Sequence, residues 1–339
     1  MSIYIHKIKH KLWESYIYNP PLNYSYFKFW AKSEHTFNKI NENNKKKIIE
    51  FEQILLMTGD SFNYEFMLSK KNNLIDRLTQ EDIKYLIAPT NKSKIDALYY
   101  LKNNPIIEKK IRVVNPSINL MRFKNRLNKK NTIKEKLNLL FIGQRFYGKG
   151  GPICFEIANE LNKRKINFKF KFVSRDVPDG YVIPENVEII NCKISEDEKY
   201  ELYNWAHLFL FPVVQDSFGV YLECIETCTP IISTNIFDKS DIIIDNEMGR
   251  MIETPFQLYD YTKFGTRWKN WEEFNKCFIG EFNRGLFNDM IVNFIKAIEY
   301  YLTYPEIYEK VINNIERIAI EKFHPQKRNN TLLSIYKNL

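Results

Sequence analysis

The sequence lacks an apolar run long enough to cross a membrane, and its cysteines do not form a recognisable framework. A membrane-spanning helix needs about 18 to 20 consecutive apolar residues, and no such run occurs in the 339 residues. The five cysteines are odd in number and match neither a disulfide framework nor paired zinc-ligand spacing. The first residues mix charged and aromatic side chains, unlike a signal peptide. We therefore expect free thiols and a cytoplasmic protein.

Glycine is scarce in the first part of the chain, and two common phosphate-binding signatures are missing. Ten of the 11 glycines lie beyond residue 140, so loops that bring backbone close to a ligand are expected in the second half. The glycines from Gly143 onward match neither GxxxxGK[ST] nor GxGxxG. These absences argue against a P-loop NTPase and against the usual dinucleotide-binding fold.

Positive charge is concentrated in the first half. Residues 1–136 hold 26 Lys and Arg against 13 Asp and Glu, whereas the remainder holds 24 against 28. An excess of positive charge in the first half of the chain indicates an anionic partner. The alternatives are membrane lipid, a charged glycan and nucleic acid. An ordinary lysine-rich surface explains the same count. Because no nucleic-acid-binding module is present, we expect no nucleic acid, and peripheral contact with an anionic membrane stays open.

Buried apolar segments alternate with helical patterns along the first half, which predicts an α/β layer with a parallel sheet. A helix is expected over 62–80, and another from Asn91, which would be its N-cap. Residues 39–53 are expected to form a solvated helix or loop. The basic stretch 121–136 is either a linker between domains or an ordinary surface helix. Strands are predicted at 53–58, 85–90 and 111–119.

The second half repeats the alternation. Proline at 152 suits the first turn of a helix over 152–163, and Ser195 with Glu198 forms a capping box for a helix over 195–206. Residues 255–285 hold nine aromatics, which indicates an insertion packed by its own rings or, alternatively, a partner-binding surface. Strands are predicted at 137–143, 168–174, 186–191, 207–212 and from Pro230, and the closing helices at 286–303, 305–322 and after Pro325.

A glycine-rich loop, QRFYGKGG at 144–151, lies between a predicted strand and a predicted helix. Its glycines allow backbone to approach a ligand. Arg145 offers a planar fork for phosphate oxygens, and Lys149 adds a point charge. The loop suits a diphosphate, although a glycine turn beside a lysine is also common without one.

A second polar loop, 213–219, follows the buried strand at 207–212 and carries Gln215, Asp216 and Ser217. The helix expected from Val220 to Thr227 would place Glu223 in its first turn. Loops at the carboxyl ends of parallel strands form the ligand crevice, where helix N-terminal amides favour an anion.

The two carboxylates of this stretch suit a sugar nucleotide. A carboxylate can accept hydrogen bonds from both vicinal hydroxyls of a ribose or a hexose. Asp216 and Glu223 are therefore predicted to flank a sugar-nucleotide pocket. The alternative is that Glu223 only stabilises the start of its helix through the helix dipole.

Residues 137–254 resemble the retaining GT-B glycosyltransferases of glycosyltransferase family 4 (glycosyl transferases group 1). FIGQRFYGKGGPICFEIANEL looks like their strand, phosphate loop and helix, and LYNWAHLFLFPVVQDSFGVYLECIETCTPIISTN looks like their acidic motif, in which two Glu are separated by seven residues with Phe-Gly between them. The resemblance implies an α/β GT-B fold, in which two Rossmann-like domains with parallel sheets face each other across a cleft and the first is reduced. The implied domains are a basic acceptor-side domain at 1–132, a nucleotide-sugar-binding domain at 133–322 with the insertion 255–285, and a C-terminal helix at 323–339 that crosses back.

The resemblance also implies roles for individual residues. Arg145 and Lys149 would bind the donor diphosphate and stabilise it as a leaving group, and Asp216 would touch the donor sugar. Glu223 would hold the ribose hydroxyls, and backbone near Ile194 would meet the base. The implied donor-binding set is Gly143, Arg145, Lys149, Gly150, Ile194, Gln215, Asp216, Ser217, Phe218, Gly219 and Glu223, with Asp216, Lys149 and Arg145 as the catalytic residues.

The function implied by the resemblance is transfer of a sugar from a UDP- or GDP-linked donor to a glycan or lipid-linked acceptor, with retention of configuration. No cofactor and no metal are expected, because cationic side chains and helix amides offset the charge of the diphosphate. The alternative is an inactive nucleotide-sugar-binding homologue that serves as a subunit or scaffold in glycan assembly, since the first domain is short.

Overall fold

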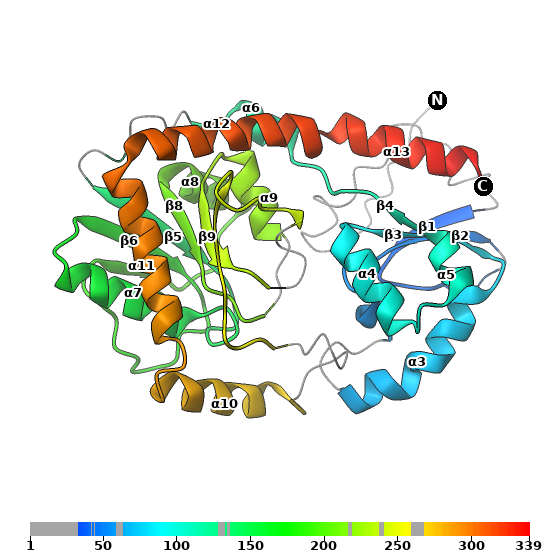
Figure 1. Ribbon diagram of the computed structural model, residues 1–339, viewed down its shortest axis with the longest axis horizontal. Coiled ribbons are helices and arrows are strands. Elements are labelled where there is room, and N and C mark those ends of the chain that lie inside the picture. The colour runs from blue at the N-terminus through cyan, green and yellow to red at the C-terminus, as the bar shows by residue number, and fades with distance from the viewer. Residues whose placement is uncertain are drawn as a thin grey trace. The chain divides into compact units, whose positions relative to one another are not determined.

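The computed structural model divides the chain into two compact units, each with a parallel sheet (Figure 1). Unit 1 comprises Met1–Ser117, Tyr259–Asn270 and Lys322–Leu339, and unit 2 comprises Ile118–Leu258 and Trp271–Glu321. The predicted α/β class with two parallel sheets is confirmed. The structure describes residues 33–41, 43, 45–58, 64–127, 133, 136–215, 219–236, 241–258 and 268–339.

Among the described residues of unit 1, four parallel strands form a sheet in the order β1-β2-β3-β4. Its core holds buried apolar side chains such as Phe51, Leu86 and Tyr100. A second cluster packs Leu332 and Ile335 of the C-terminal helix on residues of β2 and β3. The elements are β1 (Ser33–Phe37), β2 (Lys46–Glu50), the 3-10 helix η1 (Ile54–Thr58), α3 (Tyr64–Thr79), β3 (Ile83–Ala88), α4 (Asn91–Tyr100), α5 (Pro105–Lys110), β4 (Ile111–Val113) and α13 (Pro325–Lys337).

Three predictions in unit 1 are wrong. The strand expected at 53–58 is the 3-10 helix η1. The strand lies earlier, at β2, where a solvated helix or loop was expected, because Ile48 and Ile49 pair with β3 and are buried. Thr90, not Asn91, caps α4, since the Thr90 hydroxyl accepts a hydrogen bond from the Ser93 amide at 3.0 Å.

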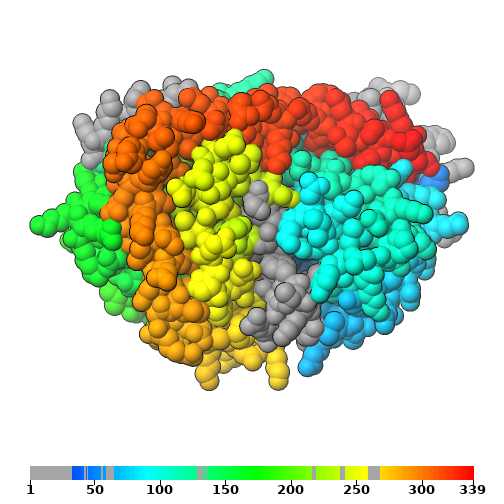
Figure 2. Space-filling model, in the orientation of Figure 1, coloured from blue at the N-terminus to red at the C-terminus, as the bar shows by residue number. Residues whose placement is uncertain are grey.

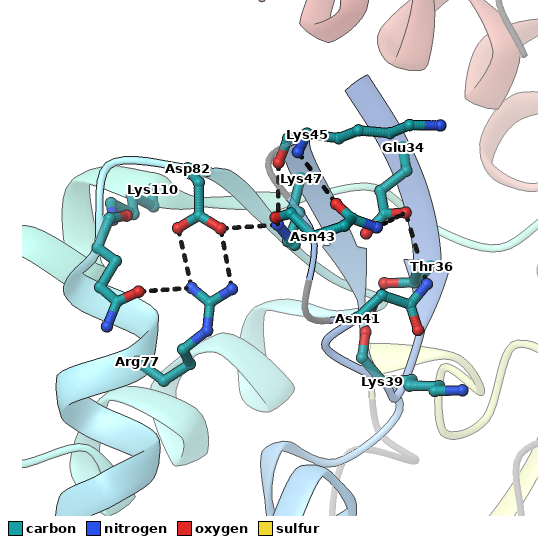
Figure 3. Close-up of polar contacts among 11 residues, drawn as sticks. Glu34, Thr36, Lys39, Asn41, Asn43, Lys45, Lys47, Arg77, Asp82 and Lys110 are labelled. Atoms are coloured by element: carbon teal, nitrogen blue, oxygen red, sulfur yellow. Dashed lines mark hydrogen bonds and ion pairs between the residues drawn. The ribbon is translucent and has the colours of Figure 1, made fainter. Parts of the chain in front are cut away.

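Asp82, directly before β3, connects this strand to α3 and to β2 through its side chain (Figure 3). Its two carboxylate oxygens accept bonds from both terminal nitrogens of Arg77, at 2.8 and 2.9 Å. The buried Lys47 ammonium donates to Asp82 at 2.7 Å and also to the carbonyl oxygens of Asn43 and Lys45. This pairing stabilises a lysine inside β2, next to the irregular register between β2 and β3.

We expect Asp82→Asn to lower the free energy of unfolding by about 2 kcal/mol at neutral pH, because buried Lys47 loses its ionic partner. The hydrogen bonds from Arg77, with those from Lys47, hold the pKa of Asp82 well below its ordinary value and outweigh its partial burial. The ionised Asp82 carboxylate therefore contributes its full stabilisation of the folded state above the unfolded-state pKa of about 3.9, and this stabilisation is lost as the pH falls below that value. Urea denaturation of both proteins at descending pH should show the difference shrink; a constant difference would contradict this assignment.

A buried ion pair joins α13 to the sheet of unit 1. Arg328 donates from one terminal nitrogen to both carboxylate oxygens of Glu50, at 2.7 and 2.8 Å, and each side chain is only 1% exposed. Its other terminal nitrogen donates to the Asn115 carbonyl at 3.2 Å. Burial alone would raise the pKa of Glu50, but Arg328 and His35 outweigh it and the pKa lies below its ordinary value.

In unit 2, six described strands form a parallel sheet in the order β10-β9-β8-β5-β6-β7. From β5 the chain proceeds to β6 and β7 on one side and returns to β8, β9 and β10 on the other, so the strand order reverses between β5 and β8. The strands are β5 (Leu137–Ile142), β6 (Phe168–Val173), β7 (Val187–Ile190), β8 (Leu208–Phe211), β9 (Ile231–Thr234) and β10 (Gly249–Ile252).

The helices of unit 2 pack on this sheet and on one another. α11 lies beside α7 (Figures 1 and 2). It also contacts the edge strand β10, and α9 contacts both α6 and α8. The predicted capping box is confirmed, with Ser195 and Glu198 bonding each other's backbone amides at the start of α8. The helices are α6 (Leu120–Lys124), α7 (Gly151–Lys163), α8 (Glu196–Trp205), α9 (Gly219–Glu226), α10 (Trp271–Asn283), α11 (Asn288–Thr303) and α12 (Pro305–Lys322).

Candidate functional site

The two loops singled out in the sequence meet where the strand order of the larger sheet reverses. One loop follows β5 and the other follows β8, and these strands are neighbours. The amides of Val214 and Gln215 both donate to the carbonyl oxygen of Gly148, at 3.1 Å each. In an open parallel sheet, this reversal at the carboxyl ends of the strands is where ligands bind.

The close approach of the two loops requires a glycine. Gly150 has a φ of 76° and precedes α7, and a Cβ placed there would lie 2.0 Å from the carbonyl oxygen of Pro212. Any other side chain at this position would push the loops apart. Gly143 joins the end of β5 to β6 by donating its amide to the Val173 carbonyl at 3.0 Å.

The Lys149 side chain connects the two loops. It is 9% exposed, and its ammonium donates to the Gln215 carbonyl oxygen at 3.4 Å. The same ammonium lies 5.8 Å from the centre of the Phe211 ring. The Gln215 side-chain oxygen is buried, and no described residue hydrogen-bonds to it. The junction therefore presents a nearly buried cation, which suits an anionic group, and a hydrogen-bond acceptor, which suits a hydroxyl of the same ligand.

Arg145 is held by two residues that the sequence reasoning missed. It has a φ of 64°, and its amide donates to the Asp176 carboxylate at 2.5 Å. Its guanidinium lies 4.2 Å from the Trp271 ring centre, a cation–π contact. Asp176 follows β6 at the same sheet edge, so its position after a predicted strand could have identified it from the sequence. Trp271 begins α10, within the predicted insertion, and lies too far along the chain from Arg145 for sequence patterns to indicate the contact.

Glu223 does not lie in the first turn of its helix, so that prediction is wrong. α9 begins at Gly219, and no acidic residue lies in its first turn, which also removes the helix-dipole explanation for Glu223. The side chain is instead buried against α8. The Lys199 ammonium lies 2.6 Å from Glu223 Oε1, and the Tyr203 hydroxyl donates to Oε2 at 2.8 Å. Sequence reasoning missed both partners.

A second buried carboxyl, Glu226, lies one helical turn beyond Glu223. Its Oε1 accepts the Asn119 amide at 2.6 Å, and its Oε2 lies 3.9 Å from Arg122. Burial, helped by the charge of Glu223, raises the pKa of Glu226 to about 8 despite the opposing effects of Asn119, Arg122 and Lys199. This shift favours the uncharged form of Glu226, beside a Glu223 that is ion-paired with Lys199.

The remaining predicted residues divide into two groups. Ile194 is half-buried and follows β7, directly before the cap of α8, so it lies at the same edge of the sheet. Asp216, Ser217 and Phe218 lie outside the described residues.

Within the part of the chain that the structure describes, no group of three or more His, Cys, Asp and Glu side chains is placed to hold a metal ion. None of its helices combines the length and the apolar character that crossing a membrane requires.

Comparisons with known proteins give matches to solved structures alone. No family model matches the chain, and no curated protein matches it. Sucrose-phosphate synthase from Thermosynechococcus elongatus aligns with a TM-score of 0.61 at 13% identity, over 93% of this chain and 75% of the other. Anabaena HepE in complex with UDP-glucose aligns with a TM-score of 0.59 at 10% identity, over 87% and 73%. WaaG, a glycosyltransferase involved in lipopolysaccharide biosynthesis, aligns with a TM-score of 0.55 at 18% identity, over 84% and 76%.

At such low sequence identities, the structural similarity shows the fold alone. The matches extend over most of this chain, so they include both parallel sheets. The protein therefore has the α/β fold of the GT-B glycosyltransferases, with two Rossmann-like parallel sheets.

Proposed function

We propose that this protein is a retaining glycosyltransferase of the family 4 type, which moves a sugar from a nucleotide-diphosphate donor to a glycan or lipid-linked acceptor. The observation that carries the proposal is the junction of the loops after β5 and β8, where Lys149 bridges to Gln215 at the strand-order reversal. Glu223 lies eight residues beyond Gln215 in the sequence, on helix α9, which follows the same loop. This arrangement suits a diphosphate joined to a ribose.

The proposed roles follow the chemistry of each side chain. Arg145 and Lys149 hold the diphosphate, and Glu223 accepts hydrogen bonds from the ribose hydroxyls. Gly143, Gly150 and the loop amides at 217–219 allow backbone to approach the phosphates and the sugar. Backbone near Ile194 meets the base, while Gln215 and Asp216 contact the donor sugar.

In the proposed reaction, the bond between the anomeric carbon and the phosphate oxygen breaks, and that oxygen leaves with the electron pair. The acceptor hydroxyl oxygen forms its bond on the same face of the sugar, and its proton passes to the leaving phosphate. Cations positioned at the developing negative charge lower the barrier to this step. In this proposal Arg145 and Lys149 supply that charge, and no metal is required.

The proposal extends to the donor and the acceptor. The UDP-glucose bound by Anabaena HepE makes UDP-sugars the first donors to test, with GDP-sugars next. The role of WaaG in lipopolysaccharide biosynthesis supports a lipid-linked glycan as acceptor. The basic first half supports peripheral contact with an anionic membrane, and co-sedimentation with anionic vesicles tests that contact.

We expect UDP or GDP to raise the melting temperature of the wild-type protein, because a ligand of the folded state stabilises it. The matching nucleotide sugar should be hydrolysed slowly without an acceptor. Glu223→Ala should weaken nucleoside diphosphate binding by about tenfold or more, since a buried carboxylate that bonds the ribose is lost. Thermal shift and isothermal titration measure the binding, and release of free nucleotide measures the hydrolysis.

Glu247→Ala is a matched control, because Glu247 is an exposed carboxylate paired with Arg317. It should leave binding and hydrolysis unchanged. Full activity in Glu223→Ala would overturn the role of that residue. A wild-type protein that binds the nucleotide sugar and never turns it over would instead support the inactive homologue acting as a subunit or scaffold.

A further inference from the structure

The Glu223 carboxylate is held from both sides by one helix. Lys199 and Tyr203 are four residues apart on α8, so they lie on the same helical face. Lys199 contacts Oε1 at 2.6 Å, and the Tyr203 hydroxyl donates to Oε2 at 2.8 Å. Each carboxylate oxygen therefore has one partner from α8.

These two contacts leave Glu223 with a specific remaining capacity. A carboxylate offers about four lone-pair positions, two on each oxygen. The contacts from α8 use one position on Oε1 and one on Oε2. Among the contacts of the described residues, one acceptor position is left on each oxygen, which matches two adjacent hydroxyls such as the 2′- and 3′-hydroxyls of a ribose.

Lys199 keeps its charge in this partly buried setting. Burial by itself would lower the pKa of Lys199, but attraction to Glu223, with bonds to Glu223 and Glu196, more than offsets it and the pKa lies above its ordinary value. Glu196 is also 3.1 Å from Arg122 on α6. The charge on Glu223 is thus compensated by a network that extends over three helices.

Tyr203 is well fixed. Its ring is buried and lies 5.2 Å from the ring of Phe209 in β8. Its carbonyl oxygen accepts the Thr229 hydroxyl at 3.1 Å. A hydroxyl carried by so constrained a ring fixes the direction of the Glu223 carboxylate as well as bonding it.

We propose that Lys199 and Tyr203 are positioning residues that orient the Glu223 carboxylate so that its two free acceptor positions receive the 2′- and 3′-hydroxyls of the donor ribose. The inference rests on the proposed function, because it assigns the partners of the proposed ribose-binding residue. It predicts that α8 determines discrimination between ribose and deoxyribose.

The test compares the binding of UDP and GDP with that of their 2′-deoxy counterparts by isothermal titration. The wild-type protein should bind the preferred ribonucleotide about tenfold more tightly than its deoxy form, because the deoxy form leaves one acceptor position unfilled. Lys199→Met and Tyr203→Phe should each reduce this preference to about threefold or less. Tyr203→Phe keeps the ring and its packing, so it provides a reading even where Lys199→Met folds poorly.

The control is Tyr200→Phe, which removes a hydroxyl from the same helix but one that donates to the Arg122 carbonyl at 2.7 Å. It should keep the wild-type preference. If Lys199→Met and Tyr203→Phe weaken both ligands equally, or keep the full preference, the positioning role is wrong while the proposed function stands. If the wild-type protein binds no nucleoside diphosphate, the proposed function fails, and this inference fails with it.

Discussion

Replacing Lys149 with alanine is expected to lower the rate of donor hydrolysis and sugar transfer by about 10²- to 10³-fold. Lys149 is nearly buried at the junction of the loops after β5 and β8, and its ammonium bridges to Gln215. A cation in such a water-poor position acts strongly on charge that develops on a leaving diphosphate. The rate of nucleotide release from the donor measures the effect.

The loss should appear mainly in kcat, because the charge on the leaving group grows as the bond breaks. Lys163→Ala is the matched control: Lys163 is the last residue of α7, the helix that follows the loop of Lys149, but it is 69% exposed and pairs only with Glu160 among the described contacts. It should leave the rate unchanged. Wild-type turnover in Lys149→Ala would remove the cation from the mechanism and leave the fold assignment intact.

Replacing Arg328 with alanine is expected to lower the free energy of unfolding by about 3–5 kcal/mol, the usual cost of stranding a buried charge. The loss of Arg328 would leave the buried Glu50 without the guanidinium nitrogen that bonds both of its carboxylate oxygens. It would also leave the Asn115 carbonyl without its donor. Chemical denaturation followed by circular dichroism measures the difference.

Two comparisons identify the cause of that loss. Arg317→Ala removes an exposed arginine with two surface ion pairs, and it should change stability by less than about 1 kcal/mol. The double substitution Arg328→Met with Glu50→Leu should regain much of the stability, because no charge is then buried alone. A double variant as unstable as the single one would show that packing, and not the stranded carboxylate, explains the loss.

Some of the fold could be read from local pattern. The strands β5 and β8 are largely apolar runs, β6 alternates phenylalanine with lysine, and the helices α8 and α12 carry clear starting signals. β2 could not be read in this way. It begins with lysines, and the reason Lys47 can be buried is Asp82, which lies 35 residues away.

The candidate site was predictable to the same extent. The loops at 144–151 and 213–219 were identified because glycine and charged residues directly follow buried strands. The partners of Arg145 and Glu223 were not identified. Trp271 lies far along the chain from Arg145, and Lys199 and Tyr203 belong to a helix whose orientation toward Glu223 depends on packing.

The alternation of strands and helices, the parallel sheets and the positions of the two loops could be predicted from the amino-acid sequence, because these depend on residue type over short stretches. Which charges are buried, and which side chains hold Glu223, Arg145 and Glu50, depends on how the helices and sheets pack. Those contacts join residues that are distant in the chain. Their geometry exists only once the helices have packed on the sheets and water has been excluded from between them.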